Sequence, residues 1–121
     1  MKNQQMTAKL NLILTRDKRY KLDAYEFISK SIDHAREVGG KTGHLSGAEL
    51  LAAFIDLSRR KYGNMARLVL ESWGIYKASD VGDAVFNLVE AGILSKRPED
   101  SREDFDIPTS FIALFDKFDL D

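Results

Sequence analysis

The chain has 121 residues, of which 44% are hydrophobic and 31% are charged, and it contains no cysteine. This length suits one domain that buries roughly two-thirds of the surface of the unfolded chain. The lack of cysteine excludes disulfide bonds, thiolate zinc sites and cysteine nucleophiles. No long apolar stretch follows the N-terminal residues, so the sequence predicts neither a secretory signal nor a membrane span. We therefore expect a cytoplasmic domain without membrane contact.

The formal net charge of -1 combines regions of opposite sign. Residues 1–21 form a basic N-terminal region with a net charge of +5, residues 22–97 are neutral, and residues 98–121 carry a net charge of -6. Opposite charges favour contact between the two ends of one chain, or between the basic end of one copy and the acidic end of another. Two unrelated, solvated ends are an equally favoured alternative.

The first predicted element covers residues 8–14. Leu10, Ile13 and Leu14 have the spacing of one helix face, whereas the alternation of Leu10, Leu12 and Leu14 fits a strand nearly as well. The residues alone leave the choice between helix and strand open.

Two longer helices follow. Asp23 and Glu26 form an acidic version of a capping box, and the apolar stripe behind them ends at Gly39. Ser46 caps the next helix, which runs to Tyr62 and ends at Gly63. The basic run 59–61 lies in its last turn, where cations complement the helix dipole. We prefer this structural interpretation to a nucleic-acid patch.

The next predicted helix begins at Asn64 as its cap and ends before Gly74. Its apolar side contains Met65, Leu68, Val69 and Trp73, and we expect Trp73 to anchor the core. Ser79 or Asp80 caps the helix after it, and Gly92 ends that helix. Its inward positions are Val81, Ala84, Val85, Leu88 and Val89.

The pattern of residues 93–108 predicts a small β-hairpin. The pattern of residues 109–121 predicts an acidic helix with an apolar face. This face carries Phe111, Phe115 and Phe118. So large an apolar face must cover the domain's own core or, as the alternative, a second copy in a homodimer. The sequence thus predicts one domain over residues 1–121, mainly α with five or six helices and one hairpin, around a helical core at residues 22–92.

The order helix, turn, helix, hairpin after residue 64 is that of a winged helix-turn-helix, so we expect a winged-helix-like arrangement. A DNA reader needs basic or amide side chains on the solvent side of its recognition helix. Here that side carries mostly carboxylates: Asp80, Asp83, Asn87 and Glu90. The sequence therefore favours a non-enzymatic module that binds a protein partner, through these four residues and Phe111, Phe115 and Phe118.

Two other functions are weaker alternatives. A DNA-binding transcriptional regulator would use Arg19, Lys96, Arg97 and Arg102, although acidic residues surround the last three. A small enzyme would need an unrecognised polar site, for which the acidic loop 100–104 with Arg19 and Tyr20 is the candidate. His34 and His44, expected at the surface, lack metal-ligand spacing, and no nucleophile or phosphate-loop motif occurs. We therefore assign no catalytic residue, metal or cofactor.

Several blocks of sequence are similar to one family of proteins. They lie at residues 17–20, 24–27, 46–51, 67–75, 85–96 and 100–105, and they span most of the chain. On these blocks the chain resembles the Minf-type family of uncharacterised bacterial proteins. The resemblance implies a bacterial, soluble, stand-alone domain and implies no activity. Relatives also suggest a helix before the first block, which favours the helical interpretation of residues 8–14; they tend to have proline where this chain has Lys18.

Overall fold

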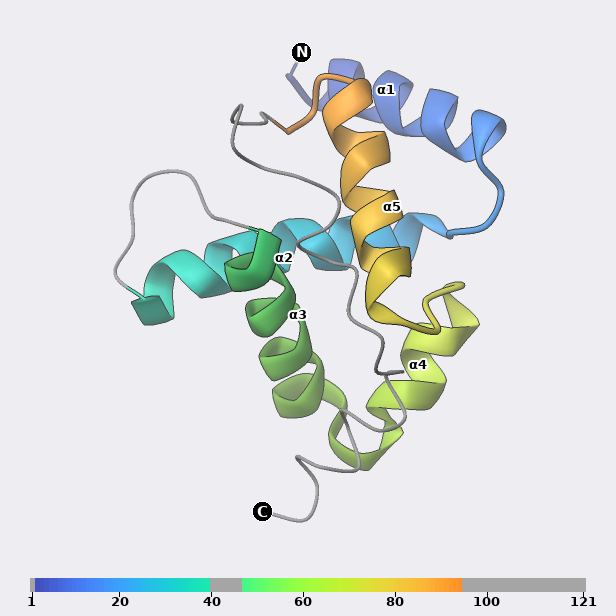
Figure 1. Ribbon diagram of the computed structural model, residues 1–121. Helices are drawn as coiled ribbons and strands as arrows, with labels where there is room; N and C mark the ends of the chain where they lie inside the picture. Colours follow the sequence, from blue (N-terminus) through green and yellow to red (C-terminus); the bar gives the residue numbers. More distant parts are fainter. Residues whose placement is uncertain (1, 40–46, 95–121) are drawn as a thin grey trace.

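A computed structural model describes residues 2–39 and 47–94 (Figure 1). These residues are mainly helical and include no β-strand, so the mainly helical prediction is confirmed for them. The elements are α1 (Lys2–Arg16), α2 (Leu22–Gly39), α3 (Gly47–Tyr62), the 3-10 turn η1 (Gly63–Met65), α4 (Ala66–Ser72) and α5 (Ala78–Glu90). Of the predicted hairpin only Ile93 and Leu94 are described, and the predicted helix at 109–121 lies outside the described residues.

Helix α1 settles the open choice for residues 8–14. Ile13 is buried, and Leu10 and Leu14 pack against the core, whereas the side chain of Leu12 is 63% exposed. Burial therefore follows the helical period rather than the alternation of a strand. The helix is also longer at both ends than the apolar pattern predicts, because polar residues continue it without contributing to the apolar stripe.

Helices α2 and α3 pack extensively against each other. Phe27 of α2 meets Phe54 of α3 edge-on, with 5.3 Å between the ring centroids, and its ring lies 5.4 Å from that of Trp73. Trp73 thus packs against the core, as expected. Asp23 lies in the first turn of α2, which begins one residue earlier at Leu22, so its prediction as the capping residue is wrong.

The start of α4 also differs from the prediction. Asn64 lies inside η1, and the residue that caps α4 is Met65, whose side chain makes no capping hydrogen bond. The short 3-10 turn rotates the following helix, so Met65 and Leu68 are exposed while Ala66 and Leu70 are buried. The predicted inward side of this helix is therefore wrong at both exposed positions.

Helices α4 and α5 end in the same way. Gly74 and Gly92 have φ values of +93° and +78°, and the isoleucine after each donates its N–H to the carbonyl five residues earlier. This is the Schellman pattern, which favours glycine because a Cβ is strained at positive φ. Both predicted helix ends are confirmed. However, Ile93 and Leu94 bond back to Leu88 instead of starting an extended strand, since they complete this cap.

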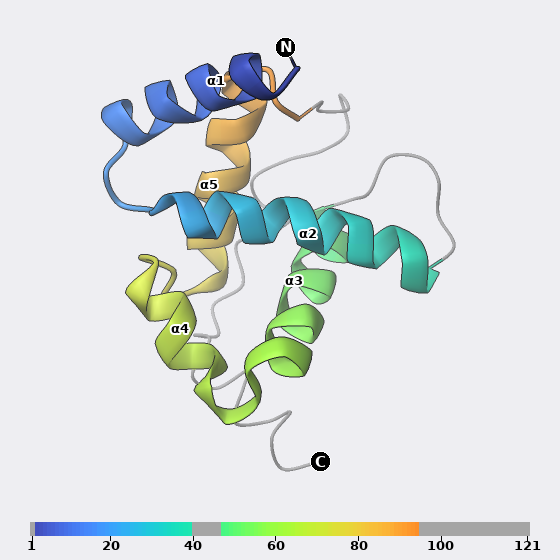
Figure 2. The same ribbon diagram turned by 180° about the vertical axis from the view of Figure 1, so that it is seen from behind.

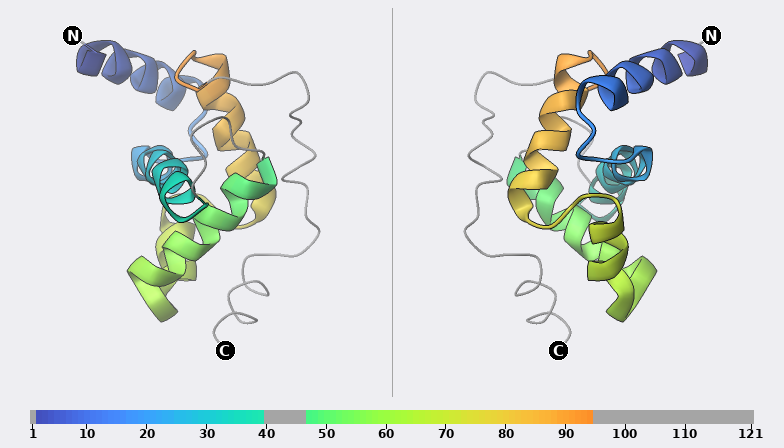
Figure 3. Two further views of the ribbon diagram at one scale, coloured as in Figure 1. Left: turned by 90° about the vertical axis from the view of Figure 1, so that its left-hand side faces the viewer. Right: turned by 90° about the vertical axis from the view of Figure 1, so that its right-hand side faces the viewer.

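Helix α5 connects the parts of the fold that position the candidate site. Figure 2 shows α1 and α2 passing on one side of α5, with α4 near its beginning. Figure 3 shows that the N-terminal half of α1 extends away from the other helices. The helix-turn-helix order of α4 and α5 is present, while the winged-helix-like arrangement as a whole stays a prediction because the hairpin is not described.

Candidate functional site

The short connection between α1 and α2, residues 17–21, packs against the turn between α4 and α5. We call it the corner. The Lys21 N–H donates a hydrogen bond of 3.1 Å to the Trp73 carbonyl, and the Arg19 carbonyl lies directly against Gly74. The corner therefore rests on the turn between α4 and α5.

Asp80 joins the corner to the start of α5. Its Oδ2 accepts hydrogen bonds from the N–H groups of Tyr76 at 2.9 Å and Lys77 at 3.1 Å, which are donors at the helix start. Its Oδ1 accepts from the Tyr20 hydroxyl at 2.9 Å. The predicted cap at Ser79 or Asp80 is wrong in position, because the N-cap is Lys77. Asp80 nevertheless accepts the hydrogen bonds of backbone N–H groups at the helix start, although it lies three residues after the N-cap.

One turn further along α5, Asp83 meets Arg19. The Arg19 guanidinium lies 3.1 Å from an Asp83 carboxylate oxygen and 2.7 Å from Asp17 Oδ2. The side chains of Asp17 and Asp83 are only 17% and 16% exposed, whereas that of Arg19 is 58% exposed. Arg19 thus neutralises two largely buried carboxylates while one side of it faces solvent.

Asn87 continues the same face of α5. Its amide nitrogen donates to Asp17 Oδ2 at 2.9 Å and to the Tyr25 hydroxyl at 3.1 Å. Beyond it, Arg16 and Glu90 form a longer ion pair of 3.7 Å between exposed side chains. Such an exposed pair contributes little to stability.

The four residues of α5 predicted to face solvent therefore face the corner and the end of α1. We call this set of paired side chains the clasp; it contains Arg16, Asp17, Arg19, Tyr20, Tyr25, Asp80, Asp83, Asn87 and Glu90. The spacing of the α5 residues shows that they share one helix face, but polar character alone does not distinguish solvent from a polar neighbour. The basic and aromatic residues at 16–20 were the available signal for such a neighbour.

The contacts within the clasp shift the pKa values of Asp17 and Tyr20 in opposite directions. The hydrogen bonds from Arg19 hold the pKa of the Asp17 carboxyl well below its ordinary value. Burial, with the carboxylate of Asp80 next to it, raises the pKa of Tyr20 far above the usual 10.0 for tyrosine. The clasp is thus built from an ionised acid and a neutral phenol, neither of which is poised to exchange a proton near neutral pH.

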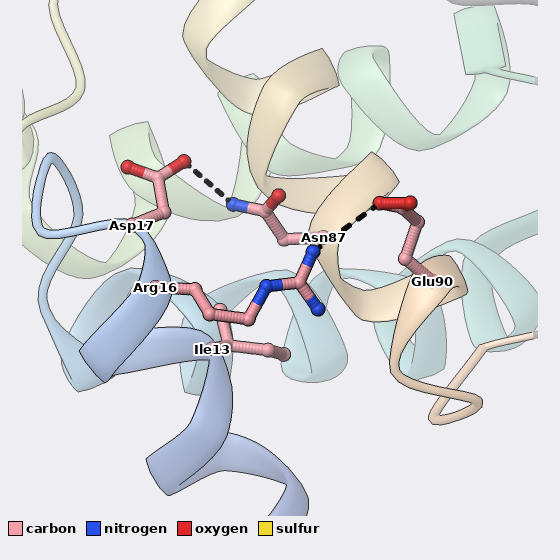
Figure 4. Close-up of a pocket in the computed structure, with 5 residues that line it drawn as sticks. All are labelled: Ile13, Arg16, Asp17, Asn87 and Glu90. Atoms are coloured by element: carbon pink, nitrogen blue, oxygen red, sulfur yellow. Dashed lines mark hydrogen bonds and ion pairs between the residues drawn. The ribbon is translucent and has the colours of Figure 1, made fainter.

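A small open pocket of about 230 Å³ lies between α1 and α5 (Figure 4). Its lining is Ile13, Arg16, Asp17, Asn87 and Glu90. Figure 4 shows Asp17 bonded to Asn87, and Arg16 reaching towards Glu90. Ligand pockets for small molecules usually measure about 300–1,000 Å³ and offer converging polar groups that are free to bind. This pocket is smaller, and its polar groups contact each other.

The other predicted site residues are placed as follows. Arg19, the candidate for nucleic-acid contact in the basic region, is committed to two carboxylates of its own chain. The remaining candidates lie outside the described residues: Lys96, Arg97, Arg102, Phe111, Phe115 and Phe118. Tyr20, considered for an enzyme site, is buried and donates its hydroxyl to Asp80.

A second polar contact, between α2 and α3, was not expected. His34 is only 14% exposed, and its Nε2 lies 2.7 Å from Asp56 Oδ2, which also accepts from Arg60 at 2.9 Å. The expectation that His34 is a surface histidine is therefore wrong. In the part of the chain that the structure describes, no group of three or more potential metal ligands comes together, and no helix has the length and apolar character to cross a membrane.

In comparisons with protein-family models, curated proteins and solved structures, nothing matches this chain. The resemblance to the Minf-type family stays a prediction from the sequence blocks.

Proposed function

We propose that the protein is a non-enzymatic, cytoplasmic module that binds another protein through its helical surface. One observation carries this proposal: the polar face of α5, where a helix-turn-helix protein would read DNA, is covered by the corner of the same chain. Asp80, Asp83 and Asn87 all bond to residues of the corner or of α2. A duplex approaching this face would have to displace the clasp and then meet its carboxylates.

The same pairing supports a role without catalysis. A general base or nucleophile needs an available lone pair within reach of a substrate, and a general acid needs a proton that it can give to the substrate. Asp17 accepts hydrogen bonds at both of its oxygens, and Tyr20 is held neutral by burial. The clasp therefore holds α1 on α5, and the polar groups that do so are paired with each other.

Protein binding is supported by large apolar side chains that the fold leaves exposed. Leu12 on α1 and Leu68 on α4 are 63% and 49% exposed, and Met65 and Tyr76 are exposed to a similar degree. Contact with a partner would remove these apolar surfaces from water, which favours association. The clasp and the core fix the helices that carry them.

Photo-crosslinking in cells that produce the protein tests the proposal. Benzoylphenylalanine is placed at position 12, 68 or 76 in the full chain, with Lys30, an exposed polar position on α2, as the matched control. We expect a discrete protein adduct from at least one of the three positions and none from position 30. Absence of adducts at all three would overturn the proposal.

A gel-shift titration with duplex DNA between 50 and 200 mM salt tests the competing function. A DNA-binding regulator would bind with an affinity that falls steeply over this range, because phosphate contacts release counterions. We expect no specific complex at any of these salt concentrations. Specific, salt-sensitive binding would replace the proposed function by DNA binding.

A further inference from the structure

We propose that the outer face of α1, formed by Ala8, Leu12 and Arg16, binds an acidic segment of a partner protein that carries apolar side chains. This inference rests on the proposed function and names the surface and the chemistry of the partner. Ala8, Leu12 and Arg16 are four residues apart in turn, so they form one line along the helix. All three are exposed, and Leu12 is the most exposed large apolar residue among those described.

The charge of α1 selects an acidic partner. The helix contains Lys2, Lys9 and Arg16 and no acidic residue, and the corner adds the exposed Lys18 and Lys21. Arg16 is 67% exposed, and its contact with Glu90 is a long pair of 3.7 Å between exposed side chains, which a partner carboxylate can replace at little cost. An apolar anchor next to an available guanidinium fits a segment in which acidic and apolar side chains alternate along one face.

The position of α1 makes this face accessible. Figure 3 shows the helix extending from the body of the fold, while Ile13 and the clasp fix its C-terminal half against α5. The Lys9 ammonium lies 3.7 Å from the position that a Cβ would take at Gly92. Gly92 follows the C-terminus of α5, so this ammonium complements the negative end of the helix dipole. The face is thus rigid before it binds, which lowers the entropy cost of association.

A second copy and a lipid surface fit this face less well. A second copy presenting the same face would bring together two α1 helices that carry basic and no acidic residues, and like charges repel. A lipid surface requires a broad apolar face, but Leu10, Ile13 and Leu14 are packed on the core and leave Leu12 as the main exposed leucine. The exposed face of α4 does not indicate a partner, because Arg67 and Glu71 beside Leu68 pair with each other.

The test is crosslinking from position 12 of the full chain, with sequencing of the attached peptide by mass spectrometry. We expect a peptide from another protein that is net acidic and contains leucine, isoleucine or phenylalanine. We expect the charge reversal Arg16→Glu to lower the adduct yield about tenfold, since steering and pairing both depend on this charge. Arg36→Glu, which reverses an exposed arginine in the last turn of α2, should leave the yield unchanged.

Each other outcome overturns the inference. A neutral or basic peptide, a lipid or nucleic-acid adduct, or an adduct with a second copy or with residues 98–121 of the same chain would each do so. An equal loss of yield in Arg16→Glu and Arg36→Glu would also contradict it. Adducts at position 68 or 76 with none at position 12 overturn this inference alone, whereas absence of adducts at all three positions also overturns the proposed function. Thermal unfolding of each variant confirms that it is folded.

Discussion

The backbone carbonyl of Arg19 occupies the space in which any residue other than glycine at position 74 would place its Cβ. Gly74 also has a φ of +93°, a backbone conformation that residues with a side chain rarely adopt. We expect Gly74→Ala to lower the free energy of unfolding by at least about 3 kcal/mol, because backbone strain adds to a clash with backbone atoms that cannot move aside. Urea unfolding followed by circular dichroism measures this loss.

Gly63 is the matched control for this prediction. It has a φ of +53°, but beyond its chain neighbours no atom lies within 4 Å of the position that a Cβ would take there. Gly63→Ala should therefore cost only the backbone strain, about 1 kcal/mol. Equal losses in the two variants would contradict the close contact between the corner and the turn.

Removal of the Tyr20 hydroxyl should weaken the clasp. Tyr20→Phe leaves Asp80 Oδ1 without its donor at 2.9 Å, and we expect a loss of about 1–2 kcal/mol at pH 7. Because the folded-state pKa of Tyr20 is raised above the usual 10.0, the folded protein holds this proton more tightly than the unfolded chain. Its contribution is complete below pH 10 and is lost as the pH rises further. Urea midpoints between pH 8 and 11 should fall less in Tyr20→Phe than in the wild type.

Asp17 should have the opposite dependence on pH. Its folded-state pKa is lowered, chiefly by hydrogen bonds from Arg19, so its contribution is present above the ordinary value of 3.8 and is lost as the pH falls below it. Asp17→Asn should cost about 1–3 kcal/mol at pH 7, in the range of charge-assisted hydrogen bonds. Its stability should also fall less than that of the wild type between pH 4 and pH 2. A parallel acid profile in the two proteins would argue against the pairing.

The contact of His34 with Asp56 predicts a smaller effect. Asp56 is 40% exposed, so solvent screens its interactions with His34 and Arg60. Asp56→Asn should lower the free energy of unfolding by about 0.5–1 kcal/mol at pH 7, less than Asp17→Asn under the same conditions. Urea denaturation of both variants in parallel gives this order, and the reverse order would show that the clasp is the weaker of the two contacts.

The sequence pattern predicted the helices and their glycine ends because these depend on local chemistry. The stops at Gly74 and Gly92 follow from backbone freedom at single positions, and the helical period of α5 follows from its buried residues Val81, Ala84 and Leu88. The pattern missed η1, because a 3-10 turn continues a helical run of residues while rotating the next helix. The local sequence pattern does not show this rotation, so Met65 and Leu68 were expected on the buried side of the helix, whereas both are exposed.

The candidate site was predicted less well, for a different reason. The polar face of α5 was recognised from its spacing, but solvent was expected where the structure places the corner. Asp17 and Arg19 could as well have been solvated, since no local rule pairs a turn with a helix about 60 residues later. Burial of paired charges is a tertiary property. The exposed position of Leu12 likewise depends on which side of α1 meets α5.

The clasp also determines the order of events while the chain is being made. Asp17 and Asn87 are 70 residues apart, and Tyr20 and Asp80 are 60 apart. At about 5–20 residues per second, the ribosome delivers Asn87 roughly 4–14 s after Asp17. During that interval α1 has no α5 to pack on, and Asp17, Arg19 and Tyr20 lack their partners there. The nascent N-terminal region therefore lacks its contacts with α5 until α5 leaves the exit tunnel, and a ribosome that stalls before that point prolongs this interval.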